Sequence, residues 1–117
     1  MSQELNNVPL VRIDAIGGNK FIVAKVFDDD GNDRTVIRGI KSCEYHAQIL
    51  AKLKGEVKGL GLNLDAQCLG GGFIRVFEKE KQITLGGSST EFGREPDRRL
   101  TVAMLAEAFP DHIIKEI

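Results

Sequence analysis

The chain has 117 residues, of which 42% are hydrophobic and 28% are charged, a composition typical of one globular domain. Sixteen Lys and Arg residues against seventeen Asp and Glu residues give a net charge of -1, which argues against a nucleic-acid-binding protein. No apolar segment approaches the roughly 20 residues that span a bilayer, and no signal peptide is recognisable. We therefore expect a soluble, cytoplasmic, monomeric single domain over residues 1–117, with residues 1–7 frayed.

Cysteine and histidine usage limits the possible cofactors. Cys43 and Cys68 are the only cysteines, and they are expected to be reduced thiols, because a chain of this size can bury a core without disulfides. With no Cys-x-x-Cys pair, and with His46 and His112 as the only imidazoles, the sequence predicts no zinc cluster. We expect no metal and no other cofactor.

Three strands are predicted in the first third of the chain. Apolar residues alternate with charged ones over residues 10–14, which indicates a half-buried strand. A turn at 17–19 precedes residues 20–27, which are apolar on both faces and suit the centre of a sheet. An Asp-Gly turn then leads into residues 34–41. The last two segments form the clearest hairpin of the sequence.

The middle of the chain changes to helical spacing. Ser42 is expected to cap an amphipathic helix that ends near Gly59. A strand follows over 62–68, and the three glycines at 70–72 are expected to break it. They match no nucleotide-binding motif, and a strand-linking bulge or a close backbone contact explains them better. A further strand is predicted over 73–77.

The last third completes the predicted fold. Residues 82–85 pair with the preceding strand, and the glycine- and hydroxyl-rich segment 86–96 is predicted to be a loop. Thr101 is expected to cap a second helix that Pro110 stops. A closing strand is predicted over 112–117. This order indicates an α+β domain with a mixed or largely antiparallel sheet and two helices.

His46 is the first candidate for a catalytic role. It lies in the first turn of the predicted helix, where the helix dipole disfavours an imidazolium and helps to keep the ring neutral. A neutral ring can accept a proton. Its spacing from Ile49, Leu50 and Leu53 is more often that of a core histidine, so this position has a structural explanation as well as a catalytic one.

A second candidate is the loop that begins at Gly86. Its glycines expose backbone N–H groups, and Ser88, Ser89 and Thr90 add hydroxyls, so the loop can form an anion nest. A flexible connector explains the same composition equally well.

Other polar residues carry weaker signals. Lys20, Arg38 and Lys41 lie near predicted strand ends and could steer an anionic substrate, although most such cations are simply surface charges. Cys68 lies on a strand beside apolar neighbours, which favours an inert buried thiol.

Five short motifs together resemble the phosphohistidine phosphatase family, also called the janus/ocnus family after its sex-regulated fly members. The motifs are Val-Ile-Arg-Gly at 36–39, Glu-Tyr-His-Ala at 44–47, Cys-Leu-Gly-Gly-Gly at 68–72, Gly-x-Ser-x-x-Phe-Gly at 87–93 and Phe-Pro-Asp at 109–111. Each is weak alone, but they occur in the family's order and spacing.

The resemblance implies a mixed, largely antiparallel sheet of about six strands flanked by two helices. It also implies metal-independent removal of phosphate from protein histidine, with phosphohistidine-containing proteins as partners. His46 matches the catalytic histidine, as general base or nucleophile. Further residues are then expected to hold or steer the phosphate: Lys20, Arg38, Ala47, Gly87, Ser88, Ser89, Thr90 and Glu91.

The chain also departs from the family pattern. Phe73 stands directly after the triple glycine, where the family usually has arginine, and the nearest arginine is Arg75. In a regular strand these two side chains share a sheet face. Gln48 replaces an acidic residue, and a histidine expected shortly after Gly93 is missing. These changes keep open the alternative of a catalytically weak phosphate- or phosphopeptide-binding protein.

Overall fold

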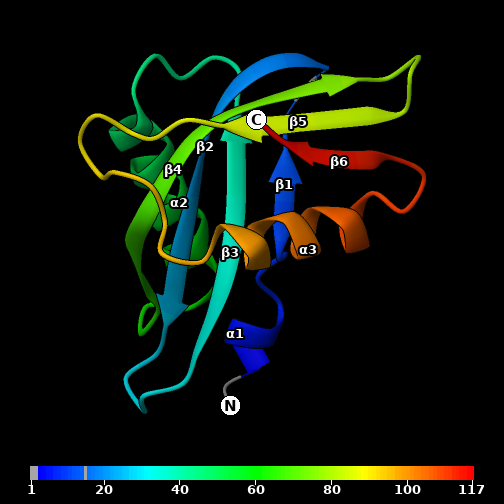
Figure 1. Cartoon of the computed structure of the whole chain (residues 1–117). Helices are drawn as coiled ribbons and strands as arrows, with labels where there is room; N and C mark the ends of the chain where they lie inside the picture. Colours follow the sequence, from blue (N-terminus) through cyan, green and yellow to red (C-terminus); the bar gives the residue numbers. More distant parts are fainter. Residues whose placement is uncertain (1–2, 15) are drawn as a thin grey trace.

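A single six-stranded sheet organises the protein in a computed structural model that describes residues 3–14 and 16–117 (Figure 1). The strands are β1 Val11–Ile13, β2 Gly17–Phe27, β3 Asp33–Ile40, β4 Asp65–Phe77, β5 Gln82–Gly86 and β6 Ile113–Glu116. Their order is β1-β3-β2-β4-β5-β6, with parallel pairing at both edges and antiparallel pairing between the others. The predicted α+β class with a mixed, largely antiparallel sheet is confirmed.

The sheet is centred on β2, which lies between β3 and β4. The predicted hairpin is present, with Phe27 paired to Asp33 at the turn and Lys20 paired to Ile40 at the far end. The turn predicted at 17–19 is wrong, because β2 already begins at Gly17, where it pairs with Val76 of β4. A long partner strand supplies hydrogen bonds that keep this glycine-rich segment extended.

The break expected at 70–72 is wrong, because β4 continues through the three glycines, but the bulge and the close backbone contact expected there are confirmed. The glycines lie inside one continuous strand, next to a bulge at Leu69 of β4, which lies opposite Val23 and Ala24 of β2. A Cβ atom on Gly71 would lie 2.1 Å from the carbonyl oxygen of Phe21, and one on Gly72 would lie 2.2 Å from that of Gly86. These positions need glycine because neighbouring backbone approaches them closely.

Two long helices cover opposite faces of the sheet (Figure 1). The three helices are α1 Gln3–Asn6, α2 His46–Leu60 and α3 Arg98–Ala108. Ile49, Leu53 and Val57 of α2 pack against one face, and Leu105 of α3 packs against the other. Because α3 contacts both edge strands, β1 and β6, the sheet curls around it.

Fraying was expected over residues 1–7; residues 1–2 lie outside the part that the structure describes, and the segment is ordered from residue 3. Residues 3–6 form α1, and Leu5 is fully buried in the core beneath α2. The guanidinium of Arg34 donates hydrogen bonds to the carbonyls of Leu5, Asn6 and Val8, at 3.1, 2.9 and 3.2 Å. This side chain attaches the segment to β3, which a reading of local polarity could not foresee.

Both long helices begin at a cap different from the predicted one. The N-cap of α2 is Tyr45 instead of Ser42, and the Gln48 side chain accepts hydrogen bonds from the backbone N–H groups of Glu44 and Tyr45 at 2.8 and 2.9 Å. The N-cap of α3 is Asp97, whose carboxylate accepts from the N–H of Leu100 at 3.1 Å. The shift makes His46 the first residue of α2.

Candidate active site

A cleft of about 600 Å³ opens where the start of α2 faces β4 and the loop between β5 and α3. Residues proposed from the sequence line much of it: Lys20, His46, Ala47, Ser88, Ser89, Thr90 and Glu91. Glu44, Tyr45 and Phe73 complete the lining. Gly87 does not line this cleft. It lines a second groove beside it and directly precedes the loop residues 88–91 of the cleft. The fold thus brings together segments that lie far apart in the sequence.

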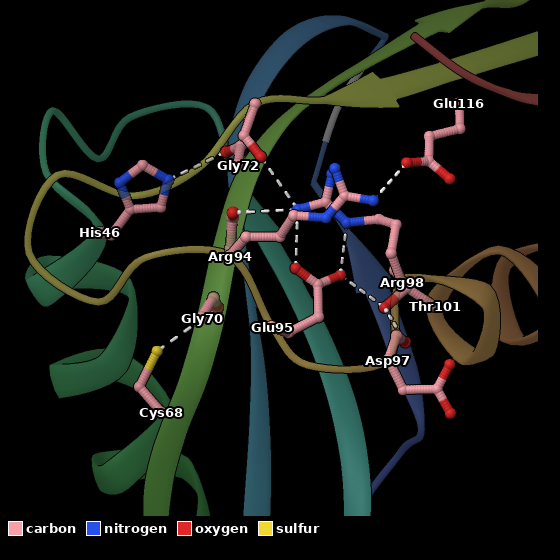
Figure 2. Close-up of polar contacts among 12 residues, drawn as sticks. His46, Cys68, Gly70, Gly72, Arg94, Glu95, Asp97, Arg98, Thr101 and Glu116 are labelled. Atoms are coloured by element: carbon pink, nitrogen blue, oxygen red, sulfur yellow. Dashed lines mark hydrogen bonds and ion pairs between the residues drawn. The ribbon is translucent and has the colours of Figure 1, made fainter.

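His46 is held in one orientation by the backbone of β4. The residue is 6% exposed, and its Nε2 lies 2.9 Å from the carbonyl oxygen of Gly72. Because a carbonyl oxygen only accepts, Nε2 must carry the proton, and in a neutral ring Nδ1 keeps its lone pair. Figure 2 shows the second ring nitrogen directed away from Gly72. It makes no hydrogen bond to any residue that the structure describes, so it is free to act as a base.

Phe73 forms a wall of the cleft between His46 and Lys20. Its ring meets the His46 ring edge-on, with centroids 6.0 Å apart, and the Lys20 ammonium lies 5.3 Å from the Phe73 ring centroid. The register of the sheet explains this grouping, because Lys20 of β2 pairs with Phe73 of β4. Phe73 is 52% exposed and lines the cleft, so it presents an aromatic surface there.

The loop after β5 is a closed turn and not a flexible connector. Ser89 and Gly93 exchange two backbone hydrogen bonds, at 3.1 and 2.8 Å, and the Ser89 hydroxyl accepts from the N–H of Phe92 at 3.1 Å. Ser89 is 3% exposed. Its hydroxyl hydrogen makes no bond within the described part of the chain, so the group can donate to a ligand in the cleft.

Residues on two sides of the cleft carry backbone N–H groups without partners among the described residues. His46 and Ala47 are the first residues of α2, whose N–H groups lack partners within the helix and lie at the positive end of its dipole. Across the cleft, the N–H groups of Ser88, Thr90 and Glu91 donate to no group that the structure describes. Together with the Lys20 ammonium, these donors suit a phosphate-sized anion.

A buried arginine holds the base of this loop (Figure 2). The Arg98 side chain is 3% exposed and forms a two-point ion pair with Glu95, at 2.7 and 2.8 Å. It also donates to the carbonyls of Gly87 and Gly71, at 3.0 and 3.2 Å. The Thr101 hydroxyl donates to Glu95 at 2.6 Å. Burial raises the pKa of the Glu95 carboxyl, but the hydrogen bonds from Arg98 and Thr101 outweigh it and hold the pKa below its usual range.

Comparison with known proteins identifies the family. A sequence profile described as the Janus/Ocnus family matches residues 5–113. This chain belongs to the Janus/Ocnus family. Sex-regulated protein janus-A of Drosophila melanogaster is 38% identical over 116 residues, which cover 98% of this chain and 84% of that protein. The 14 kDa phosphohistidine phosphatase of Sus scrofa is 31% identical over 117 residues, which cover 95% of this chain and 90% of that protein.

One residue expected at the site of this Janus/Ocnus protein lies elsewhere. The structure does not bring Arg38 to the cleft of His46; its side chain is buried and donates two hydrogen bonds to Glu56 of α2, at 3.0 and 2.7 Å. Burial raises the pKa of Glu56, but the Arg38 bond and charge outweigh it and lower the pKa overall. Arg38 therefore joins α2 to β3.

The two cysteines of this Janus/Ocnus protein are free thiols, as expected. Burial raises the pKa of Cys68; a contact with the Gly70 carbonyl opposes the shift, and the nearby charges of Glu91 and Glu95 add to it. Cys68 is thus a protonated thiol near neutral pH and a poor nucleophile. Among the described residues, no three His, Cys, Asp or Glu side chains are placed to hold a metal ion, and no helix is long and apolar enough to cross a membrane.

The Arg98 cluster is the part of the site that sequence reasoning missed. Glu95, Arg98 and Thr101 follow one another at intervals of three residues, but the same spacing is common on exposed helix starts. The expected role of Thr101 as a cap is wrong, because Asp97 caps α3 and the Thr101 hydroxyl bonds Glu95. Only the tertiary position of these side chains shows that they are buried together.

Proposed function

We propose that this Janus/Ocnus protein is a phosphohistidine phosphatase that hydrolyses the P–N bond of phosphohistidine in proteins. The observation that carries the proposal is the hydrogen bond from His46 Nε2 to the Gly72 carbonyl, which leaves Nδ1 available beside a set of N–H donors. The similarity to the phosphohistidine phosphatase of Sus scrofa supports the choice of substrate. The proposal also takes the protein to be a cytoplasmic monomer.

In the proposed reaction, His46 Nδ1 removes a proton from a water molecule as that water attacks phosphorus. The P–O bond forms, the P–N bond breaks, and the substrate imidazole leaves with its electron pair and takes up a proton. Alternatively, Nδ1 attacks phosphorus itself, and water then hydrolyses the phosphorylated His46. Acid-labile phosphate trapped on His46 would indicate the second route, and its absence in rapid-quench experiments would favour the first.

The remaining groups of the cleft are assigned to the phosphoryl oxygens. The N–H of Ala47, the Ser89 hydroxyl and the N–H groups of residues 88–91 that are not already bonded donate to them, and Lys20 adds a positive charge. Most of these donors are already fixed by the helix start and by the closed turn. Preorganised donors stabilise charge in the transition state without further reorganisation.

A second candidate is a protein that binds phosphate or a phosphopeptide with little turnover. Two features of the cleft favour weak turnover, because they reduce the positive charge that can stabilise a phosphoryl transition state. Glu44 and Glu91 place carboxylates in the lining, and Phe73 contributes no charge, so Lys20 is the single cation among the lining residues. The janus-A relatives carry no enzyme name and fit this candidate equally.

One pair of measurements separates the candidates. Turnover of a phosphohistidine peptide is measured for the wild type and for His46→Ala, and 15N NMR spectra are recorded during titration with inorganic phosphate. The phosphatase requires turnover that His46→Ala abolishes while the fold is retained. Saturable shifts at Ala47 and Ser89 without turnover would support the binding protein. Turnover that His46→Ala leaves unchanged would refute the assignment of His46.

A further inference from the structure

A second groove, of about 700 Å³, adjoins the candidate active site. Both hollows share Lys20 and Phe73 in their linings, so the Phe73 ring lies between them. The groove runs over β2, β4 and β5 on the sheet face that α2 covers farther along, because Gly18 and Lys20 alternate in step with Ile22, which packs beneath α2. A chain segment leaving the cleft across Phe73 would enter this groove.

The groove is basic although the protein as a whole is not. Lys20, Lys41 and Arg75 line it, and no Asp or Glu side chain does. The whole chain carries a net charge of -1, so this gathering of cations is local. Within the described residues, none of the three side chains has a carboxylate within ion-pair distance; Asp14 contacts only the backbone N–H of Lys41, at 3.3 Å.

The cationic groups lie along a floor of glycine and aromatic residues. The guanidinium of Arg75 lies 6.0 Å from the Phe77 ring centroid, and its Nη2 would lie 3.6 Å from a Cβ atom on Gly18. The Lys41 ammonium lies similarly close to Gly17, at 3.8 Å from the Cβ position. These placements leave both charges facing solvent along the start of β2, where a ligand can reach them.

We infer that this groove binds an acidic peptide segment next to the phosphorylated histidine of a protein substrate. The inference rests on the proposed function, because the cleft must hold the histidine for the groove to hold its neighbours. Three cations without carboxylate partners and a lining without Asp or Glu side chains favour Asp and Glu in the ligand. Glu44 and Glu91 line the cleft itself, so the acidic preference belongs to the flanking residues and not to the whole substrate.

The test compares phosphorylated peptides that differ only in the residues around one histidine. One peptide carries Asp and Glu, a second Asn and Gln, and a third Lys and Arg; free phosphohistidine is the substrate too small to reach the groove. At low salt, we expect kcat/KM for the acidic peptide to exceed that for the neutral one by about three- to tenfold, as two or three partly exposed charge contacts would give. The ratio should shrink at high salt.

The decisive variant is the double substitution Lys41→Gln with Arg75→Gln. It should bring the ratio of kcat/KM for the acidic peptide to kcat/KM for the neutral peptide close to one. Hydrolysis of free phosphohistidine should be unchanged. The matched control is Lys52→Gln with Arg99→Gln, which removes the same charge from two exposed positions outside the groove and should keep the wild-type ratio. A wild-type ratio near one, or a ratio that the double variant leaves unchanged, would overturn the inference.

A binding experiment keeps this result separate from the proposed activity. The unphosphorylated acidic peptide is titrated into 15N-labelled protein, and the amide signals of Gly18 and Thr84, two groove residues, are followed. If no peptide is hydrolysed, the phosphatase proposal fails, but saturable shifts that the double variant abolishes would still support the groove. Absence of these shifts in the wild type would count against the groove whether or not the protein turns over phosphohistidine.

Discussion

The guanidinium of Arg98 donates a hydrogen bond of 3.0 Å to the carbonyl oxygen of Gly87, the residue where the loop facing His46 begins. The same nitrogen reaches the carbonyl of Gly71, at 3.2 Å, and Gly71 precedes the residue whose carbonyl orients His46. One buried side chain thus connects the loop after β5, which lines the cleft, to β4, whose Gly72 carbonyl orients His46. Its effect on the site is indirect, since Arg98 does not line the cleft.

Replacing Arg98 by methionine should destabilise the fold strongly. The substitution leaves the Glu95 carboxylate buried without its charged partner, a situation that costs about 3–5 kcal/mol. Urea unfolding followed by circular dichroism measures the change. The double variant Arg98→Met with Glu95→Gln should recover part of the loss, because no charge is then buried alone. A single variant within about 0.5 kcal/mol of the wild type would show that the pair contributes little.

Stability should fall at acid pH, partly because of Glu95. The pKa of Glu95 in the folded protein lies below the ordinary value of 4.5. Its ionised form therefore stabilises the fold fully at pH values above 4.5. This contribution is lost as the pH falls through the lowered pKa and the carboxylate takes up a proton. The free energy of unfolding, measured from about pH 6 to pH 3, should therefore decline less steeply in Glu95→Gln than in the wild type. Equal slopes would contradict the assignment; Glu56, whose pKa is also lowered, accounts for part of the slope that remains.

Gly71→Ala and Gly55→Ala should have opposite effects. A Cβ atom on Gly71 would lie 2.1 Å from the Phe21 carbonyl oxygen and 3.2 Å from Cδ2 of His46, so the strands must shift, at a cost of about 1–3 kcal/mol or more. Gly55 lies inside α2 with nothing within 4 Å of its Cβ position. Alanine there should stabilise the helix by up to about 1 kcal/mol. Thermal unfolding of both variants checks the pair, and a neutral Gly71→Ala would refute the close approach.

Turnover should decrease toward acid pH if His46 Nδ1 is the base. Protonation of Nδ1 removes the lone pair that the hydrogen bond to Gly72 leaves available. The profile of kcat/KM for a phosphohistidine peptide should therefore fall as the pH is lowered. Hydrolysis in the absence of enzyme provides the baseline at each pH. A profile without any decrease, down to the lowest pH at which the protein stays folded, would argue against proton removal by this ring.

The sequence predicts the parts of the fold that follow from local patterns. The hairpin of β2 and β3 and the apolar stripe of α2 are predictable because alternation and helical spacing report which face of an element is buried. The residues gathered in the cleft are identified mainly by the resemblance of short motifs to the family. Without that resemblance, His46 has two competing explanations, as a core histidine and as a base.

What could not be predicted depends on contacts between distant segments. The sequence predicts a close backbone contact at 70–72, but only the structure shows that the strand continues through these glycines and that the backbones of Phe21 and Gly86 make the contact. Arg38 and Arg98 look like surface cations in the sequence, yet both are buried beside carboxylates. The sequence provides the charges, but only packing decides which of them face solvent.

The acceptor that orients His46 is a main-chain carbonyl, and this has a consequence for genetics. No codon change can delete the oxygen of Gly72, so a mutational scan will detect this contact only through residues that displace β4. Chemical synthesis offers direct access: an ester in place of the amide between Gly72 and Phe73 weakens the carbonyl as an acceptor and keeps every side chain. Such a backbone-edited protein would test the orientation of the ring without altering its amino-acid sequence.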